Sequence, residues 1–152
     1  MIINYEKHYS IIQSMYCISN KIKQGEVPIV SIIVLKNKIL SIGFNNMLSA
    51  KNPNQHAEIQ ALRKASEVCN SFNLSRSTIY ITQEPCVMCI ESIINYNIKN
   101  IIYACSSTNK NRWHYLQYLV KKKKLDIVLN VNEKKCKRKI KRFFYNLRTK
   151  QY

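Results

Sequence analysis

His56-Ala57-Glu58 and Pro85-Cys86-Val87-Met88-Cys89 are the two stretches that decide how this chain folds and what chemistry it can perform. Two cysteines three residues apart share one face of a helix and can chelate one metal ion. Pro85 suits the position just before a helix or its first turn, where the missing N–H costs nothing. The positive end of a helix dipole also favours thiolate over thiol. We therefore expect the cysteine pair at the start of a helix.

The upstream stretch adds a histidine and a carboxylate to the cysteine pair. Residues two apart on a helix point to nearly opposite sides, so His56 and Glu58 can share a pocket only where a helix start faces it. One His and two Cys leave the fourth position of a tetrahedral zinc open to water, which then ionises near neutral pH. A carboxylate beside that position can shuttle protons without binding the metal. H-x-E followed by P-C-x-x-C is the pattern of zinc nucleobase deaminases.

A C-x-x-C pair taken alone is also compatible with a redox pair or with half of a structural zinc site. A closed structural site needs a fourth protein ligand, for which Cys105 and His114 are the candidates, and the chain has no second C-x-x-C. The upstream His-Ala-Glu, with 27 residues between Glu58 and Cys86, favours the catalytic interpretation. The remaining cysteines, Cys17, Cys69 and Cys136, are expected to be reduced packing or surface thiols.

Hydrophobic periodicity predicts an α/β domain. Two strands followed by alternating helices and strands indicate a mixed sheet covered by helices, and no linker or repeat divides the 152 residues, so residues 1–152 are expected to form a single domain. The expected helices are Tyr5–Lys23, Ala57–Cys69, Cys86–Asn95 and a basic one at Lys134–Arg148. The expected strands are Ile29–Leu35, Ile39–Phe44 (joined by a turn at Asn37-Lys38), Thr78–Thr82, Ile101–Ala104 and Ile127–Val131.

The net charge of +17, from 25 basic and 8 acidic residues, suggests an anionic partner, with nucleic acid first. Codon drift in an A/T-rich genome is the alternative source of this charge. Ile, Asn, Lys and Tyr all have A/T-rich codons, and all four are abundant in this sequence. The basic residues concentrate at Lys121–Lys124 and over Lys134–Lys150. The longest apolar run, Ile29–Leu35, is too short to cross a membrane, and the N-terminus does not resemble a signal peptide. We therefore expect a cytoplasmic protein with no membrane contact.

From these residues outward the chain resembles bacterial tRNA-specific adenosine deaminases, within the cytidine deaminase-like superfamily. The extended Glu-Pro-Cys-Val-Met-Cys string and the late aromatic pair favour the tRNA branch over the rest of the superfamily. The resemblance covers roughly Tyr5 to Arg148. Its motifs are Gly25-Glu26-Val27-Pro28, Gly43-Phe44-Asn45, Asn52-Pro53, His56-Ala57-Glu58-Ile59, Ala61-Leu62-Arg63, Thr82-Gln83-Glu84-Pro85-Cys86-Val87-Met88-Cys89 and Phe143-Phe144.

The resemblance implies a three-layer α/β/α fold with a central mixed five-stranded sheet and a basic C-terminal helix at about residues 133–149. It implies one Zn²⁺ per subunit, held by His56, Cys86 and Cys89, with Glu58 as the catalytic proton shuttle. Asn45 would hydrogen-bond the bound nucleoside. The further expected substrate contacts are Ala57, Glu84, Phe143 and Phe144. The implied enzyme is a homodimer that hydrolyses the wobble adenosine of an arginine tRNA to inosine, releasing ammonia, within the anticodon stem-loop.

This sequence departs from the family's usual pattern at three places. Ala104-Cys105-Ser106-Ser107 replaces Gly-Ala-Arg-Asp, Asn46-Met47 replaces Arg-Pro, and Val30 replaces a small Gly. Two other functions are therefore kept open. One is a deaminase of free cytosine or guanine, which needs no extended basic surface. The other is a catalytically inactive RNA-binding partner subunit, which would have no use for Glu58.

Overall fold

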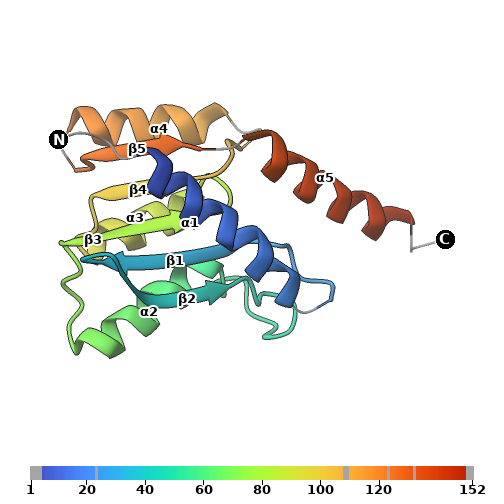
Figure 1. Cartoon of the computed structure of the whole chain (residues 1–152), viewed down its shortest axis with the longest axis horizontal. Coiled ribbons are helices and arrows are strands. Elements are labelled where there is room, and N and C mark those ends of the chain that lie inside the picture. The colour runs from blue at the N-terminus through green and yellow to red at the C-terminus, as the bar shows by residue number, and fades with distance from the viewer. Residues whose placement is uncertain (1–4, 23, 108–109, 123, 132, 150–152) are drawn as a thin grey trace.

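A mixed β-sheet with helices on both faces forms the body of the protein (Figure 1). The computed structural model describes residues 5–22, 24–107, 110–122, 124–131 and 133–149. The sheet has five strands in the order β2-β1-β3-β4-β5. β1 pairs antiparallel with β2 and β3, whereas β3 with β4 and β4 with β5 are parallel, so the expected mixed sheet is confirmed. The strands are β1 (Val30–Leu35), β2 (Lys38–Phe44), β3 (Ser77–Ile81), β4 (Asn100–Tyr103) and β5 (Ile127–Asn130).

Alternation of side chains along the strands divides the hydrophobic core into two layers. Ile33, Ile79 and Ile101 pack with apolar residues of α2, α3 and α4 on one face. Ile32 and Tyr80 pack on the other face, with residues of α1 and α5. The helices are α1 (Tyr5–Ile18), which continues as the 3-10 turn η1 (Ser19–Lys21), α2 (Ala57–Cys69), α3 (Val87–Asn95), α4 (Lys110–Lys121) and α5 (Glu133–Thr149).

One helix, α4, was not predicted from the sequence. Leu116 and Leu119 are buried in the core, whereas Trp113 and Tyr118 are exposed. Two buried positions on a short helix rich in polar and aromatic residues give too weak a periodicity to separate the helix from a loop. α2, in contrast, has the predicted bounds because its apolar face is continuous.

The β1–β2 hairpin turns on two residues in the left-handed region, Lys36 (φ 46°) and Asn37 (φ 67°). A two-residue hairpin loop of this kind needs positive φ at both positions. The turn therefore lies one residue earlier than the predicted Asn37-Lys38, and β2 begins at Lys38.

Gly43 allows α2 to pack directly on β2. A Cβ at this position would lie 2.0 Å from the Ala57 carbonyl oxygen and 2.6 Å from the Ala61 amide nitrogen. Both atoms are backbone, so only glycine admits this approach. The contact sets the start of α2 against the end of β2.

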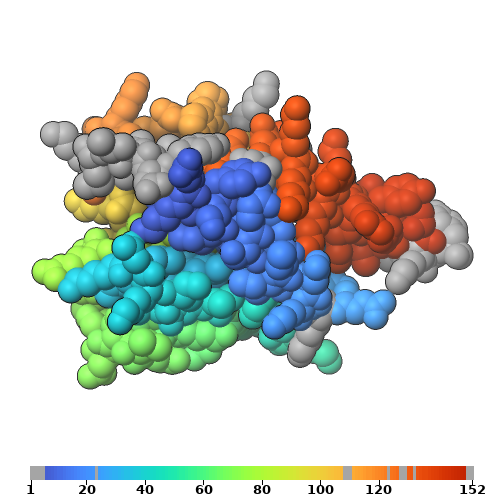
Figure 2. Space-filling model, viewed as in Figure 1, coloured from blue at the N-terminus to red at the C-terminus, as the bar shows by residue number. Residues whose placement is uncertain are grey.

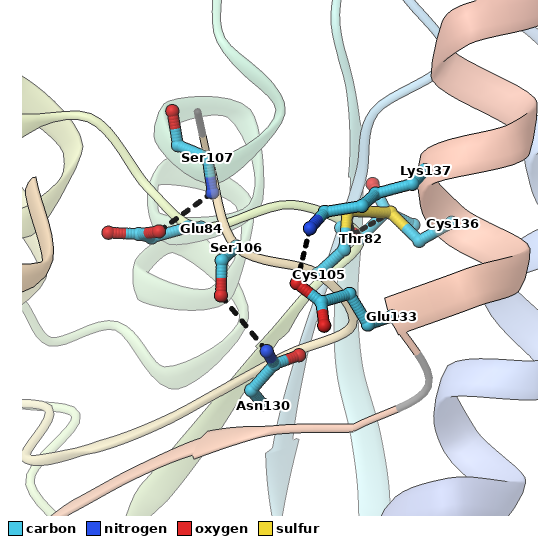
Figure 3. A network of polar contacts seen from close by, with 9 residues as sticks. All are labelled: Thr82, Glu84, Cys105, Ser106, Ser107, Asn130, Glu133, Cys136 and Lys137. Carbon is cyan, nitrogen blue, oxygen red and sulfur yellow. Dashed lines mark hydrogen bonds and ion pairs between the residues drawn. A yellow bond between two sulfur atoms is a disulfide. The ribbon is translucent and has the colours of Figure 1, made fainter. Parts of the chain in front are cut away.

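Helix α5 extends away from the sheet, alongside α1, and most of its surface is exposed (Figures 1 and 2). Among its described residues only Cys136 is buried. Cys136 forms a disulfide with Cys105, just beyond the end of β4, with 5.8 Å between the two Cα atoms (Figure 3). The expectation that Cys136 is a reduced thiol is therefore wrong. The pair is 31 residues apart and is brought together only by the packing of α5 against the end of the sheet.

None of the helices in the described parts of the chain combines the length and the hydropathy needed to cross a membrane.

Candidate active site

His56 is the N-cap residue of α2. Its backbone is extended (φ −71°, ψ 155°), and its carbonyl accepts a helical hydrogen bond from the Gln60 amide at 3.1 Å. His56 therefore lies just before the first helical residue. The rule that residues two apart on a helix point to opposite sides does not apply to it, so His56 and Glu58 can face the same pocket. Glu58 belongs to the first turn and is 4% exposed.

The start of α3 presents the two cysteines. Cys86 is the N-cap residue (φ −77°, ψ 167°), and Cys89 lies in the first helical turn. The Cys86 carbonyl accepts a hydrogen bond from the Ile90 amide at 2.9 Å. The free amide groups of a first helical turn point toward anions, which is a favourable place for thiolate ligands.

The three side chains converge on one point. His56 Nδ1 lies 3.4 Å from Cys89 Sγ and 3.7 Å from Cys86 Sγ. All three potential ligand atoms lie within 4.8 Å of one another, and among the described residues this is the cluster with donors suited to a metal. Zn–N and Zn–S bonds meeting at the tetrahedral angle put nitrogen and sulfur about 3.6 Å apart. The donor set and its spacing therefore fit zinc.

Interactions within the cluster shift the pKa values of its three side chains. The hydrogen bond from the Cys89 thiol lowers the pKa of Cys86 to about 3, and His56 contributes in the same direction, against the opposing effect of burial. The hydrogen bond with Cys86 raises the pKa of His56. The pKa of Cys89 is raised, first by its hydrogen bond to Cys86 and then by burial. A metal held by both sulfurs would displace the remaining thiol proton.

Glu58 lies beside this cluster without belonging to it. Burial raises the pKa of its carboxyl, while the charge of His56 acts in the opposite direction. Its carboxylate also interacts with the Cys89 thiol. A buried carboxyl that holds its proton more tightly than usual, next to an open metal position, is suited to general acid–base work.

Two of the expected substrate contacts, Asn45 and Ala57, lie around the start of α2. Asn45 follows β2 and is 5% exposed, and the neighbouring Asn46 amide donates to the Gln55 carbonyl at 3.0 Å, just before His56. Ala57 is fully buried against Gly43. Asn45 Nδ2 donates to Glu26 Oε2 at 2.9 Å.

Glu84 is directed toward the loop after β4 (Figure 3). It is 3% exposed, and its Oε2 accepts a hydrogen bond from the Ser107 amide at 2.7 Å. Its own amide donates to the Cys105 carbonyl at 2.8 Å. Burial raises the pKa of its carboxyl. Glu84 therefore ties the segment leading into α3 to the loop in which Ser106 and Ser107 stand.

Phe143, of the aromatic pair of α5, lines a cavity whose lining includes none of the three metal-ligand residues. Phe143 and Phe144 contact each other edge to face, with 5.2 Å between ring centroids. Phe144 is 41% exposed. Phe143 lines a cavity of about 590 Å³ between α1 and α5, together with Tyr16, Pro28 and four basic residues, Lys135, Arg138, Lys139 and Arg142.

Two residues near the site have no role that the sequence could assign. Glu26 is the partner of Asn45, and it stands within the Gly25–Pro28 motif, whose residues carry no expected function. Arg112, on α4, is close enough for its charge to oppose the increase in the pKa of both His56 and Glu84. No sequence signal could have identified Arg112, because α4 itself was not predicted.

Comparison with known proteins identifies the family of this chain. The family model of MafB19-like deaminases matches residues 4–148. A tRNA-specific adenosine deaminase from Buchnera aphidicola subsp. Schizaphis graminum is 34% identical over 129 residues, which cover 83% of this chain and 85% of that protein.

Two solved structures have the same cytidine deaminase-like α/β fold. One comes from a study of A-to-I editing by tRNA:A34 deaminases at the wobble position, with 25% identity, a TM-score of 0.58 and coverage of 67% of this chain and 78% of that one. The other is guanine deaminase from Bacillus subtilis, with 27% identity, a TM-score of 0.59 and coverage of 79% and 76%. This chain is therefore a deaminase that belongs to the MafB19-like deaminase family and to the tRNA-specific adenosine deaminases.

Proposed function

We propose that this protein is a zinc-dependent hydrolase that converts the wobble adenosine of a tRNA, an arginine tRNA in the first instance, to inosine. The observation that carries the proposal is the three-ligand cluster of His56, Cys86 and Cys89 with the buried carboxyl of Glu58 beside it. Three protein ligands leave one position open, as in catalytic rather than structural zinc sites. Zinc bound there would act as a Lewis acid and lower the pKa of water at that position to near neutrality.

Glu58 performs the proton transfers in this proposal. It accepts a proton from the attacking water and delivers it to N1 of adenine, while the water oxygen adds to C6. Glu58 then takes the proton of the new C6 hydroxyl and gives it to the amino group, which leaves as ammonia while C6 becomes a carbonyl, so that adenosine and water become inosine and ammonia. The burial that raises the pKa of Glu58 lets the carboxyl hold a proton between the two transfers.

The remaining expected contacts divide into two groups. Asn45 and Ala57 stand at the start of α2, where a nucleoside next to the metal would be held. Glu84 supports the loop after β4, in which Ser106 and Ser107 replace the family's Arg and Asp. Phe143 and Phe144, beside the basic residues of α5, would meet the RNA outside the metal pocket, where aromatic rings stack on unpaired bases.

The basic surface of α5 supports tRNA over a free base. Arg138 and Arg142, which line the cavity between α1 and α5, offer phosphate contacts that a free nucleobase cannot use. The likeness to a guanine deaminase keeps free guanine as the second candidate substrate. We further propose action in the cytoplasm and a homodimer. The homodimer is what the resemblance to the tRNA-specific adenosine deaminases implies. Light scattering of the purified protein tests the dimer.

Incubation of purified protein with a tRNA that carries a wobble adenosine, followed by sequencing for inosine, tests the function. A Glu58→Gln variant, in which the shape of the side chain is kept, is the matched inactive control. Free guanine and free cytosine are assayed in parallel. Ammonia released from guanine, together with an unchanged tRNA, would replace the proposal by the second candidate.

A further inference from the structure

Glu26 is a buried carboxylate held by hydrogen bonds from uncharged donors. It is 3% exposed. Oε2 accepts the Asn45 Nδ2–H at 2.9 Å, and Oε1 accepts the Ser49 amide N–H at 2.7 Å. Neither of the two ion pairs within the described parts of the chain involves Glu26. Burying a carboxylate is costly unless its oxygens are hydrogen-bonded, so both contacts matter to this conformation.

The contact with Glu26 determines how the Asn45 amide is oriented. A carboxylate only accepts hydrogen bonds, so it can face the NH₂ end of Asn45 but not the oxygen. Nδ2 is therefore held on the Glu26 side. The Oδ1 acceptor and the second amide hydrogen remain for another partner. Without Glu26 the two orientations of the amide would be much closer in energy.

Asn45 is held in place from three directions. Its own amide donates to the Ile29 carbonyl at 3.1 Å. The backbone amide of its neighbour Asn46 donates a hydrogen bond to the carbonyl of Gln55, the residue before His56. Two residues earlier in the chain, Gly43 lies against the start of α2. Ser49, the second partner of Glu26, belongs to the loop between β2 and α2. Glu26 thus fixes both the side chain next to the start of α2 and the loop that leads to it.

We propose that Glu26 is a positioning residue that sets the orientation of the Asn45 amide against the bound nucleoside. The inference rests on the proposed function, in which Asn45 contacts that nucleoside. Asn45 then presents Oδ1 to a hydrogen-bond donor of the substrate, and a ribose hydroxyl is the donor that a nucleoside offers and a free base lacks.

Two substitutions separate positioning from a purely structural role. Asn45 and Ser49 both donate hydrogen bonds to Glu26, and Glu26→Gln replaces one of the two accepting oxygens by an NH₂ group. With this NH₂ group facing Asn45, the Asn45 amide must rotate by 180° or lose its hydrogen bond to residue 26. Asn45→Asp puts two carboxylates face to face. In the double variant the amide NH₂ introduced at position 26 can donate to the carboxylate introduced at position 45. The oxygen of the new amide still accepts from Ser49, and position 45 again presents an acceptor to the substrate.

The experiment measures kcat and KM on an anticodon stem-loop with a wobble adenosine, with thermal melts of every variant. Glu26→Gln in the wild-type background should raise KM about tenfold, the effect of removing one charge-assisted hydrogen bond, with a smaller change in kcat. The same substitution in the Asn45→Asp background should lower KM. Glu67→Gln removes an exposed carboxylate that pairs with Arg63 and should leave KM unchanged.

An increase in KM of equal size in both backgrounds would overturn the inference, because Glu26 would then act independently of Asn45. A wild-type protein that leaves the RNA unchanged would instead count against the proposed function, and the inference would fall with it. If Glu26→Gln unfolds at too low a temperature for kinetic measurements, the thermal melts of the single and double variants test the contact instead. Stabilisation of Asn45→Asp by added Glu26→Gln supports the contact, and further destabilisation refutes it.

Discussion

Gly43→Ala is predicted to displace the active site by moving the helix that carries His56. The added Cβ would lie 2.0 Å from the Ala57 carbonyl oxygen, and real Cβ contacts essentially never fall below 3.0 Å. The nearest contact is therefore too short by about 1 Å, and the second one, with the Ala61 amide nitrogen at 2.6 Å, is also too short. Both atoms belong to the backbone and cannot rotate away, so α2 must move away from β2 by about 1 Å. Overpacking costs about 1–3 kcal/mol, and we expect the upper end here. At about 2–4 °C per kcal/mol, Tm should fall by roughly 6–12 °C.

The consequence for the site should exceed the consequence for stability. His56 is the N-cap residue of α2 and moves with it, and a displacement of about 1 Å at a catalytic group can cost roughly a hundredfold in rate. Tm, zinc content by elemental analysis and kcat/KM on the RNA substrate are measured together. Gly25→Ala is the matched control, since Gly25 has φ +94° but no neighbour within 4 Å of an added Cβ. It should lose about 1–2 kcal/mol of stability and retain zinc. An unchanged Tm and full zinc content in Gly43→Ala would refute the packing argument.

Four further predictions concern the chemistry, the metal, the disulfide and the RNA surface. Glu58→Gln should retain zinc and bind RNA but lose deamination by several orders of magnitude, and an active variant would assign proton transfer to another group. Cys86→Ala should lose zinc in elemental analysis, whereas Cys69→Ala should not, and full zinc in the former would contradict the ligand assignment. Reduction of the Cys105–Cys136 disulfide should lower the free energy of unfolding by about 3–4 kcal/mol in chemical denaturation, from the length of the loop that it closes. Cys105→Ala should then be insensitive to reductant, and equal stability with and without reductant in the wild type would speak against the crosslink. Neutralising four basic residues of α5 should weaken tRNA binding and reduce its log–log salt slope by roughly one unit for each phosphate that is no longer neutralised. An unchanged slope would attribute this charge to codon drift. The four residues are Lys137, Arg138, Lys141 and Arg142.

The elements that were predictable are those whose signal is local. α2 begins and ends as predicted because its apolar face repeats at helical spacing and Asn70, in the left-handed region (φ 47°), ends it. The cysteines of α3 were expected at a helix start because Pro85 and the three-residue spacing belong to one turn. α4 was missed because only Leu116 and Leu119 of its face are buried, so its periodicity is weak.

The sequence by itself determined the residue types of the site: a histidine, two cysteines three apart and a carboxylate two residues after the histidine. Ligand chemistry depends on donor atoms, and these are read directly from the side chains. Only the tertiary structure decided which distant residues join them. Glu26 reaches Asn45 because the loop before β1 lies beside the end of β2, and Cys136 reaches Cys105 because α5 packs at the end of β4. Such pairs are separated by 19 and 31 residues, and no local propensity encodes a contact that exists only once the sheet has formed.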